Sequence, residues 1–257
     1  MAPFASSCPV DERERAWIQE SITWFRDQFG DEPLHRPVVL PTHDYFPPPF
    51  SGSDAEVLAM VRKVSGYMAV QRQKIRVKFT NELDHAAGVA RLVPALVAHS
   101  QGAAEAGDES PSQETITIER PAIRDPAKLV AVIAHELGHV RLLGEHRISM
   151  DREDSEPLTD LATVYLGMGV FTANAAFDFG GNPRLRRAAR LRGLATGRTS
   201  YLTRQMSGYG LACLAWLREE PDPAWAKFLD TSPRGYLKQG LRYLKQNSSP
   251  GAFPPAA

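Results

Sequence analysis

The stretch of sequence that decides the fold is ETITIERPAIRDPAKLVAVIAHELGHVRLLG, residues 114–144. Its first seven residues form the clearest strand of the sequence, since Ile116 and Ile118 alternate with polar residues from Thr115 to Glu119. Asp125 and Pro126 then provide a helix N-cap and a proline at the first helical position. The apolar run that follows predicts a buried helix over residues 126–143, with Gly144 as its terminator.

This helix contains the motif HExxH as His135, Glu136 and His139. Residues four apart lie on one helix face with about 5–6 Å between their Cβ atoms, so two imidazoles can converge on one tetrahedral ion. Glu136 follows the first histidine and would reach a water on that ion rather than the ion itself. The motif therefore predicts a Zn²⁺ site with His135 and His139 as ligands and Glu136 as the catalytic base.

The segment after this helix supplies a third ligand. Glu156 and Asp160 are four residues apart at the start of a helix predicted over residues 156–169, so both face the same way. One carboxylate can complete the zinc shell while the other orients a ligand histidine by a hydrogen bond. The residues themselves leave open which of the two binds the metal.

Together these motifs resemble the gluzincins, the thermolysin-like zinc peptidases, in which HExxH on one helix is followed by ExxxD on the next. The resemblance covers residues 114–170. It implies that Glu156 is the third zinc ligand, that Asp160 hydrogen-bonds a ligand histidine, and that an extended substrate lies along the strand at residues 115–119. The metzincin pattern HExxHxxGxxH does not match, because its glycine and third-histidine positions hold Leu142 and Glu145. Glu145 and His146 are interpreted as polar residues of the loop beyond the helix.

The rest of the chain predicts a mainly helical α+β fold around a zincin-like core with a small mixed sheet. Residues 1–97 are expected to form helices at 11–29 and 54–68 and strands at 37–41 and 74–79. The composition of residues 98–113 indicates a flexible loop, and residues 114–170 form the zinc-binding catalytic core. Residues 171–246 are expected to be helical, including a helix at 201–217, and residues 247–257 to be a disordered tail.

The overall composition excludes several function classes. Thirty basic residues balance thirty acidic ones, so no net field points to nucleic acid or a membrane surface. The chain has two cysteines, Cys8 and Cys213, and no basic and apolar leader precedes Cys8. The expected environment is therefore the cytoplasm.

The sequence thus predicts a zinc metallopeptidase acting on a peptide or protein substrate. One alternative is a zinc hydrolase of a non-peptide amide or another small molecule. Others are a non-catalytic zincin-fold protein used for binding or regulation, and a peptidase whose cleft is plugged. Structural zinc sites are usually closed and rich in cysteine, so two histidines with one carboxylate favour catalysis. Four side chains were weighed as oxyanion stabilisers, and each is more simply interpreted as a core or rim residue: Tyr165, Tyr201, Arg204 and Tyr209.

Overall fold

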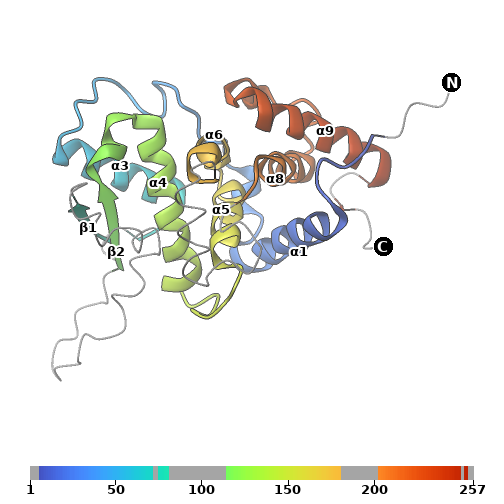
Figure 1. Cartoon of the computed structure of the whole chain (residues 1–257), viewed down its shortest axis with the longest axis horizontal. Helices are drawn as coiled ribbons and strands as arrows, with labels where there is room; N and C mark the ends of the chain where they lie inside the picture. Colours follow the sequence, from blue (N-terminus) through green and yellow to red (C-terminus); the bar gives the residue numbers. More distant parts are fainter. Residues whose placement is uncertain (1–5, 72–74, 81–113, 181–201, 250–251, 254–257) are drawn as a thin grey trace. The chain divides into compact units, whose positions relative to one another are not determined.

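Helices make up most of the described chain, with one small sheet, as the sequence predicts (Figure 1). The structure is a computed structural model that describes residues 6–71, 75–80, 114–180, 202–249 and 252–253, without the side chains of residues 176–180. The loop predicted at residues 98–113 lies outside the described residues, as does Tyr201. The chain divides into two compact units, Pro48–Met150 and the combination of Met1–Pro47 with Asp151–Ala257.

The Pro48–Met150 unit holds the sheet and the HExxH helix. Its elements are α3 (Asp54–Tyr67), β1 (Ile75–Thr80), β2 (Glu114–Glu119), the 3₁₀ turn η4 (Arg120–Arg124), α4 (Pro126–His139) and the π-helical turn η5 (Val140–Gly144). Strands β1 and β2 are parallel, with Ile75 opposite Glu114 and Thr80 opposite Glu119. Both strands were predicted, but the described sheet is parallel rather than mixed.

Burial explains how this unit holds together. Ile116 and Ile118 alternate with polar residues along β2 and are almost fully buried, as a period of two requires. Helix α4 packs against both β2 and α3. Helix α3 begins with a capping box in which Ser53 and Glu56 each bind the other's backbone N–H.

The other unit is a set of packed helices. It contains α1 (Glu12–Phe29), α2 (Glu32–His35), α5 (Ser155–Tyr165), α6 (Gly169–Gly180), α8 (Arg204–Leu217), the 3₁₀ turn η6 (Ala224–Phe228) and α9 (Thr231–Asn247). Helix α1 packs on α5 and α8, and α9 lies along α8 (Figure 1). Ile18, Ile22 and Phe25 give α1 its buried face, at the spacings of three and four that predicted this helix.

Three predictions about this unit need correction. Residues 37–41 are not a strand: Val38 and Val39 are buried, but the segment has Pro37 and Pro41 at its ends and Val39 donates to the carbonyl of Gly167 from a loop. The helix predicted over residues 156–169 ends at Tyr165, because the chain turns at Gly167 with φ 87° before α6 begins. Part of the tail predicted at residues 247–257 is held in place, since the indole N–H of Trp216 donates to the carbonyls of Ser249 and Ala252.

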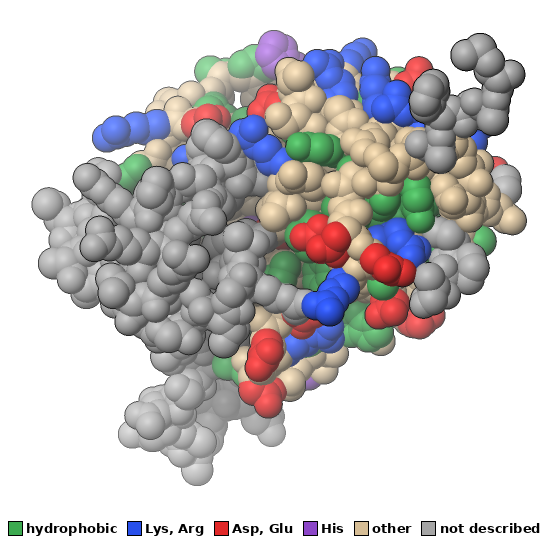
Figure 2. Space-filling model, turned by 45° about the vertical axis from the view of Figure 1, so that its right-hand side comes forward, with side chains coloured by type: hydrophobic (Ala, Val, Ile, Leu, Met, Phe, Trp, Pro, Cys, Tyr) green, Lys and Arg blue, Asp and Glu red, His purple; other side chains and the backbone are tan. Residues whose placement is uncertain are grey.

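Two surface properties bear on function. Acidic and basic side chains are interspersed on the face drawn in Figure 2, in keeping with the balanced composition. None of the helices in the described ranges is both long enough and apolar enough to cross a bilayer.

Candidate metal centre

Local sequence fixes the start of the helix that carries the histidines. The Asp125 carboxylate accepts hydrogen bonds from the backbone N–H groups of Ala127 and Lys128 at 3.0 and 3.2 Å. Pro126 occupies the first helical position, where its missing N–H leaves no bond unmade. The predicted start of the helix is therefore confirmed.

The two histidines of the motif face each other one turn apart. Their Nε2 atoms are 3.1 Å apart, and their ring centroids 4.7 Å apart with the planes at 87°. Two nitrogens that bind one tetrahedral zinc at about 2.0–2.1 Å would stand about 3.3 Å from each other. The observed separation is thus close to that required of two ligands of a single ion.

The rest of α4 makes this pair rigid. Leu129, Ile133 and Leu137 are completely buried, and they hold the helix against its neighbours. His139 is only 4% exposed, whereas His135 and Glu136 are half-buried. The pair thus has one buried imidazole and one that solvent reaches in part.

The helix changes form directly after His139. The next five residues, Val140–Gly144, make a π-helical turn instead of continuing the α-helix to Leu143 as predicted. The backbone N–H of Glu145 donates to the carbonyl of Val140 at 3.0 Å, five residues back. Single π turns inside helices are frequent at functional sites, because the wider turn re-aims the side chains around it.

Charged side chains brace this π turn. The Glu145 carboxylate accepts from Arg141 at 2.8 Å and from Arg147 at 3.0 Å, and Arg141 also donates to the carbonyl of Ala69 just beyond α3. Glu145 lies in the turn beyond the helix, as interpreted from the sequence, and its carboxylate also holds Arg141 and Arg147. His146 follows in an exposed left-handed conformation with φ 55°.

The two predicted carboxylates lie on α5, in the other unit. Glu156 is the second residue of this helix and is half-buried. Asp160, one turn later, accepts a hydrogen bond from the backbone N–H of Leu202 at 3.2 Å. This bond links Asp160 on α5 to the segment just before α8.

Among the described residues, His135, His139 and Glu156 form a group that can hold a metal ion, each offering one ligand atom. The choice of Glu156 over Asp160 as the third ligand stays a prediction from the sequence. Two imidazoles and one carboxylate are the donor set of many catalytic zinc sites.

Two of the tyrosines weighed as oxyanion stabilisers have other tasks. The Tyr165 hydroxyl donates to the carbonyl of Gly30 at 2.6 Å, and the Tyr209 hydroxyl accepts from Gln19 at 2.7 Å. Both rings are completely buried, and this burial raises the pKa of each phenol well above its usual range. They are core residues, as the simpler interpretation has it.

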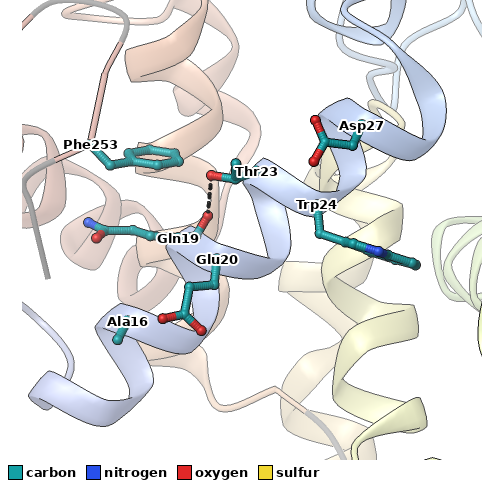
Figure 3. A pocket seen from close by; sticks show the side chains of 7 residues that line it. All are labelled: Ala16, Gln19, Glu20, Thr23, Trp24, Asp27 and Phe253. Atoms are coloured by element: carbon teal, nitrogen blue, oxygen red, sulfur yellow. Dashed lines mark hydrogen bonds between the residues drawn. The ribbon is translucent and has the colours of Figure 1, made fainter.

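A shallow hollow of about 350 Å³ lies along α1, lined by Ala16, Gln19, Glu20, Thr23, Trp24, Asp27 and Phe253 (Figure 3). Its floor is helix surface, and the one bond drawn across it joins the Thr23 hydroxyl to the carbonyl of Gln19 within the same helix. The described lining includes none of the residues predicted to bind metal, so the hollow adds nothing to that site.

Comparison of the chain with protein-family models, with curated proteins and with solved structures gives no match in any of the three. The likeness to gluzincins therefore rests on the residues of 114–170 alone, and the function has to be argued from their chemistry.

Proposed function

We propose that this chain is a zinc-dependent hydrolase that cleaves peptide bonds, with His135, His139 and Glu156 as metal ligands and Glu136 as the general base. The observation that carries the proposal is the 3.1 Å separation of the two Nε2 atoms on the rigid helix α4. At that separation the two imidazole nitrogens can bind one ion together.

The donor set fits zinc. Zinc accepts imidazole nitrogen and carboxylate oxygen together, and its catalytic sites use three protein ligands and leave a fourth position for water or substrate. Structural zinc sites mostly use cysteine, and Cys8 and Cys213 are not part of the group. The site is therefore proposed to be open and catalytic rather than closed and structural.

The proposed mechanism gives each side chain a separate task. Bound zinc supplies Lewis-acid chemistry, since it polarises a carbonyl and lowers the pKa of water. Glu136 removes the proton from the attacking water and passes it to the leaving nitrogen of the scissile amide. Because Glu136 sits next to His135 on the helix, its carboxylate is presented beside the ligands and not among them.

Asp160 is proposed to support the site rather than to bind the metal. The backbone N–H of Leu202 donates to its carboxylate, which holds the side chain in place. Outer-shell carboxylates of this kind set the tautomer and direction of ligand histidines.

The first experiment is zinc content by elemental analysis of the wild-type protein and five variants. Wild type and Glu136→Gln should hold one zinc per chain, and His139→Ala should hold none. Glu156→Gln should lose zinc far more readily than Asp160→Asn, for which a loss of about 10–100-fold in affinity is expected. His35→Ala, which removes an exposed histidine outside the motif, serves as the control and should retain zinc.

Activity then separates a peptidase from the alternatives. A peptide library should be cleaved by wild type and not by Glu136→Gln, although both contain zinc. A folded wild-type protein that takes up no zinc on reconstitution would refute the metal site. Zinc without cleavage would reject the peptidase and leave the small-molecule and non-catalytic alternatives.

A further inference from the structure

We infer that Asp154 is a positioning residue for the metal ligand Glu156, and that Trp17 and Arg152 hold it in place. This inference rests on the proposed function, because it concerns how firmly one proposed ligand is held. All four residues belong to the same compact unit.

Three hydrogen bonds converge on the Asp154 carboxylate. The indole N–H of Trp17 donates to Oδ2 at 2.7 Å. The guanidinium of Arg152 donates to Oδ1 at 2.5 Å and to Oδ2 at 3.2 Å. This guanidinium also lies 5.8 Å from the ring of Trp24 on α1. The Asp154 carboxylate is therefore linked to α1 directly through Trp17 and indirectly through Arg152.

The Asp154 carboxylate makes these bonds instead of a helix-capping bond. Asp154 occupies the N-cap position of α5, where an aspartate normally accepts from the backbone N–H two or three residues later. Among the described residues it makes no such bond to α5, and its side chain points to Trp17 and Arg152 instead. The residue therefore joins two helices rather than closing the end of one.

This bond matters for Glu156 because of where that residue stands. Glu156 is in the first turn of α5, and terminal turns have the fewest backbone hydrogen bonds and fray most readily. A ligand in such a turn needs an anchor from outside the helix. Asp154, two residues earlier, provides one by fastening the start of α5 to α1.

The far end of α5 is fastened to the same helix. The Tyr165 hydroxyl donates to the carbonyl of Gly30, which ends α1, and the Tyr165 ring lies 5.7 Å from that of Phe25. Helix α5 is thus held at both ends, and the bond from Trp17 is the one next to the proposed ligand. Loss of that bond should loosen Glu156 while the bond at Tyr165 keeps the helix in place.

The decisive variant is Asp154→Ser. Serine is well tolerated at an N-cap position, and it removes the bonds to Trp17 and Arg152. Trp17→Phe removes only the N–H donor and keeps an aromatic ring. A purely structural role predicts a lower Tm with unchanged zinc affinity and cobalt spectrum, whereas a positioning role predicts that affinity and spectrum change as well.

The chain provides a matched control. Trp225 donates its indole N–H to the Glu220 carboxylate at 2.7 Å, and Arg218 donates to the same carboxylate at 2.8 Å. This trio has the same chemistry as Trp17, Asp154 and Arg152 but touches no proposed ligand. Trp225→Phe therefore measures what the loss of such a bond does in general.

The readouts are zinc affinity by chelator competition, the visible spectrum of the cobalt-substituted protein, and the Tm of the metal-free protein. Asp154→Ser should weaken zinc binding by about 10–100-fold and change the cobalt spectrum, with Trp17→Phe smaller in the same direction. The metal-free Tm should fall in both Asp154→Ser and Trp225→Phe, because each variant loses a hydrogen bond to a carboxylate. Trp225→Phe should nevertheless match wild type in zinc affinity and spectrum.

Two results would count against the inference in different ways. Unchanged affinity and cobalt spectrum in both Asp154→Ser and Trp17→Phe would overturn the positioning role and leave the proposed function intact. Wild-type protein that binds neither zinc nor cobalt would overturn the proposed function itself, and that result is read from wild type alone.

Discussion

Gly208 gives the sharpest test of how the helices of the larger unit pack. A Cβ at this position would stand 2.5 Å from the Cβ of Tyr236, 2.9 Å from the backbone oxygen of Pro233 and 3.2 Å from the backbone nitrogen of Leu237. Two of these atoms belong to the backbone of α9, so no change of rotamer can relieve the contact. In Gly208→Ala, α9 has to move away from α8.

The size of the effect follows from these distances. Carbon atoms prefer a separation of about 3.5–4.0 Å, so α9 must shift by on the order of 1 Å. Overpacking of this kind costs about 1–3 kcal/mol, and the higher helix propensity of alanine offsets about 1 kcal/mol. Because the clash is with backbone, we expect a net loss of about 2 kcal/mol. For a chain of this size, that loss lowers Tm by about 4–8 °C.

The assay is thermal and urea unfolding followed by circular dichroism at 222 nm. Gly235→Ala on α9 is the control, because a Cβ there meets no described atom within 4 Å. It should gain up to about 1 kcal/mol from helix propensity and raise Tm. If both alanine variants shift Tm in the same direction, close approach of α8 and α9 is not the reason for a glycine at position 208.

Three further outcomes are expected. Hydrogen bonds from Ser51 and Ser53 lower the pKa of Glu56 to about 2. The stability that this carboxylate contributes is therefore present above its ordinary pKa and is lost as the pH falls from about 5 to 2. The urea midpoint of Glu56→Gln should not show this pH dependence. Burial raises the pKa of the Cys213 thiol most strongly and also that of Cys8, so both should react slowly with a thiol reagent at pH 7, and Cys213 only on unfolding, as followed by mass spectrometry. Zinc at about 100 times its Kd should stabilise the protein by about 2.7 kcal/mol, seen as a higher Tm that a chelator reverses and that His139→Ala lacks.

Local sequence was enough to predict the helix that carries the histidines. Its start depends on Asp125 and Pro126, and its buried face on apolar residues such as Leu129 and Ile133, all of which lie within a few turns of the motif. The geometry of His135 and His139 follows from this helix alone. Helix caps and buried helix faces depend on residues close together in the sequence, so the sequence pattern predicts them.

The features that the sequence did not predict depend on distant contacts. The π turn uses the same apolar residues as an α-helix would, and Leu142 and Leu143 are both buried in it. The bond from Trp17 to Asp154 joins residues 137 positions apart, so no local pattern announces it. Val38 and Val39 are residue types favoured in strands, but their apolar side chains are buried equally well in a loop.

The division of the chain also sets the order in which its parts can fold during synthesis. The unit that contains α1 and α5 is made of Met1–Pro47 and Asp151–Ala257, with Pro48–Met150 inserted between them. On the ribosome, the apolar face of α1 must therefore remain without α5 until the whole insertion has been made. Each doubling of a connecting loop costs only about 0.6 kcal/mol, so the insertion weighs on the rate of folding more than on final stability.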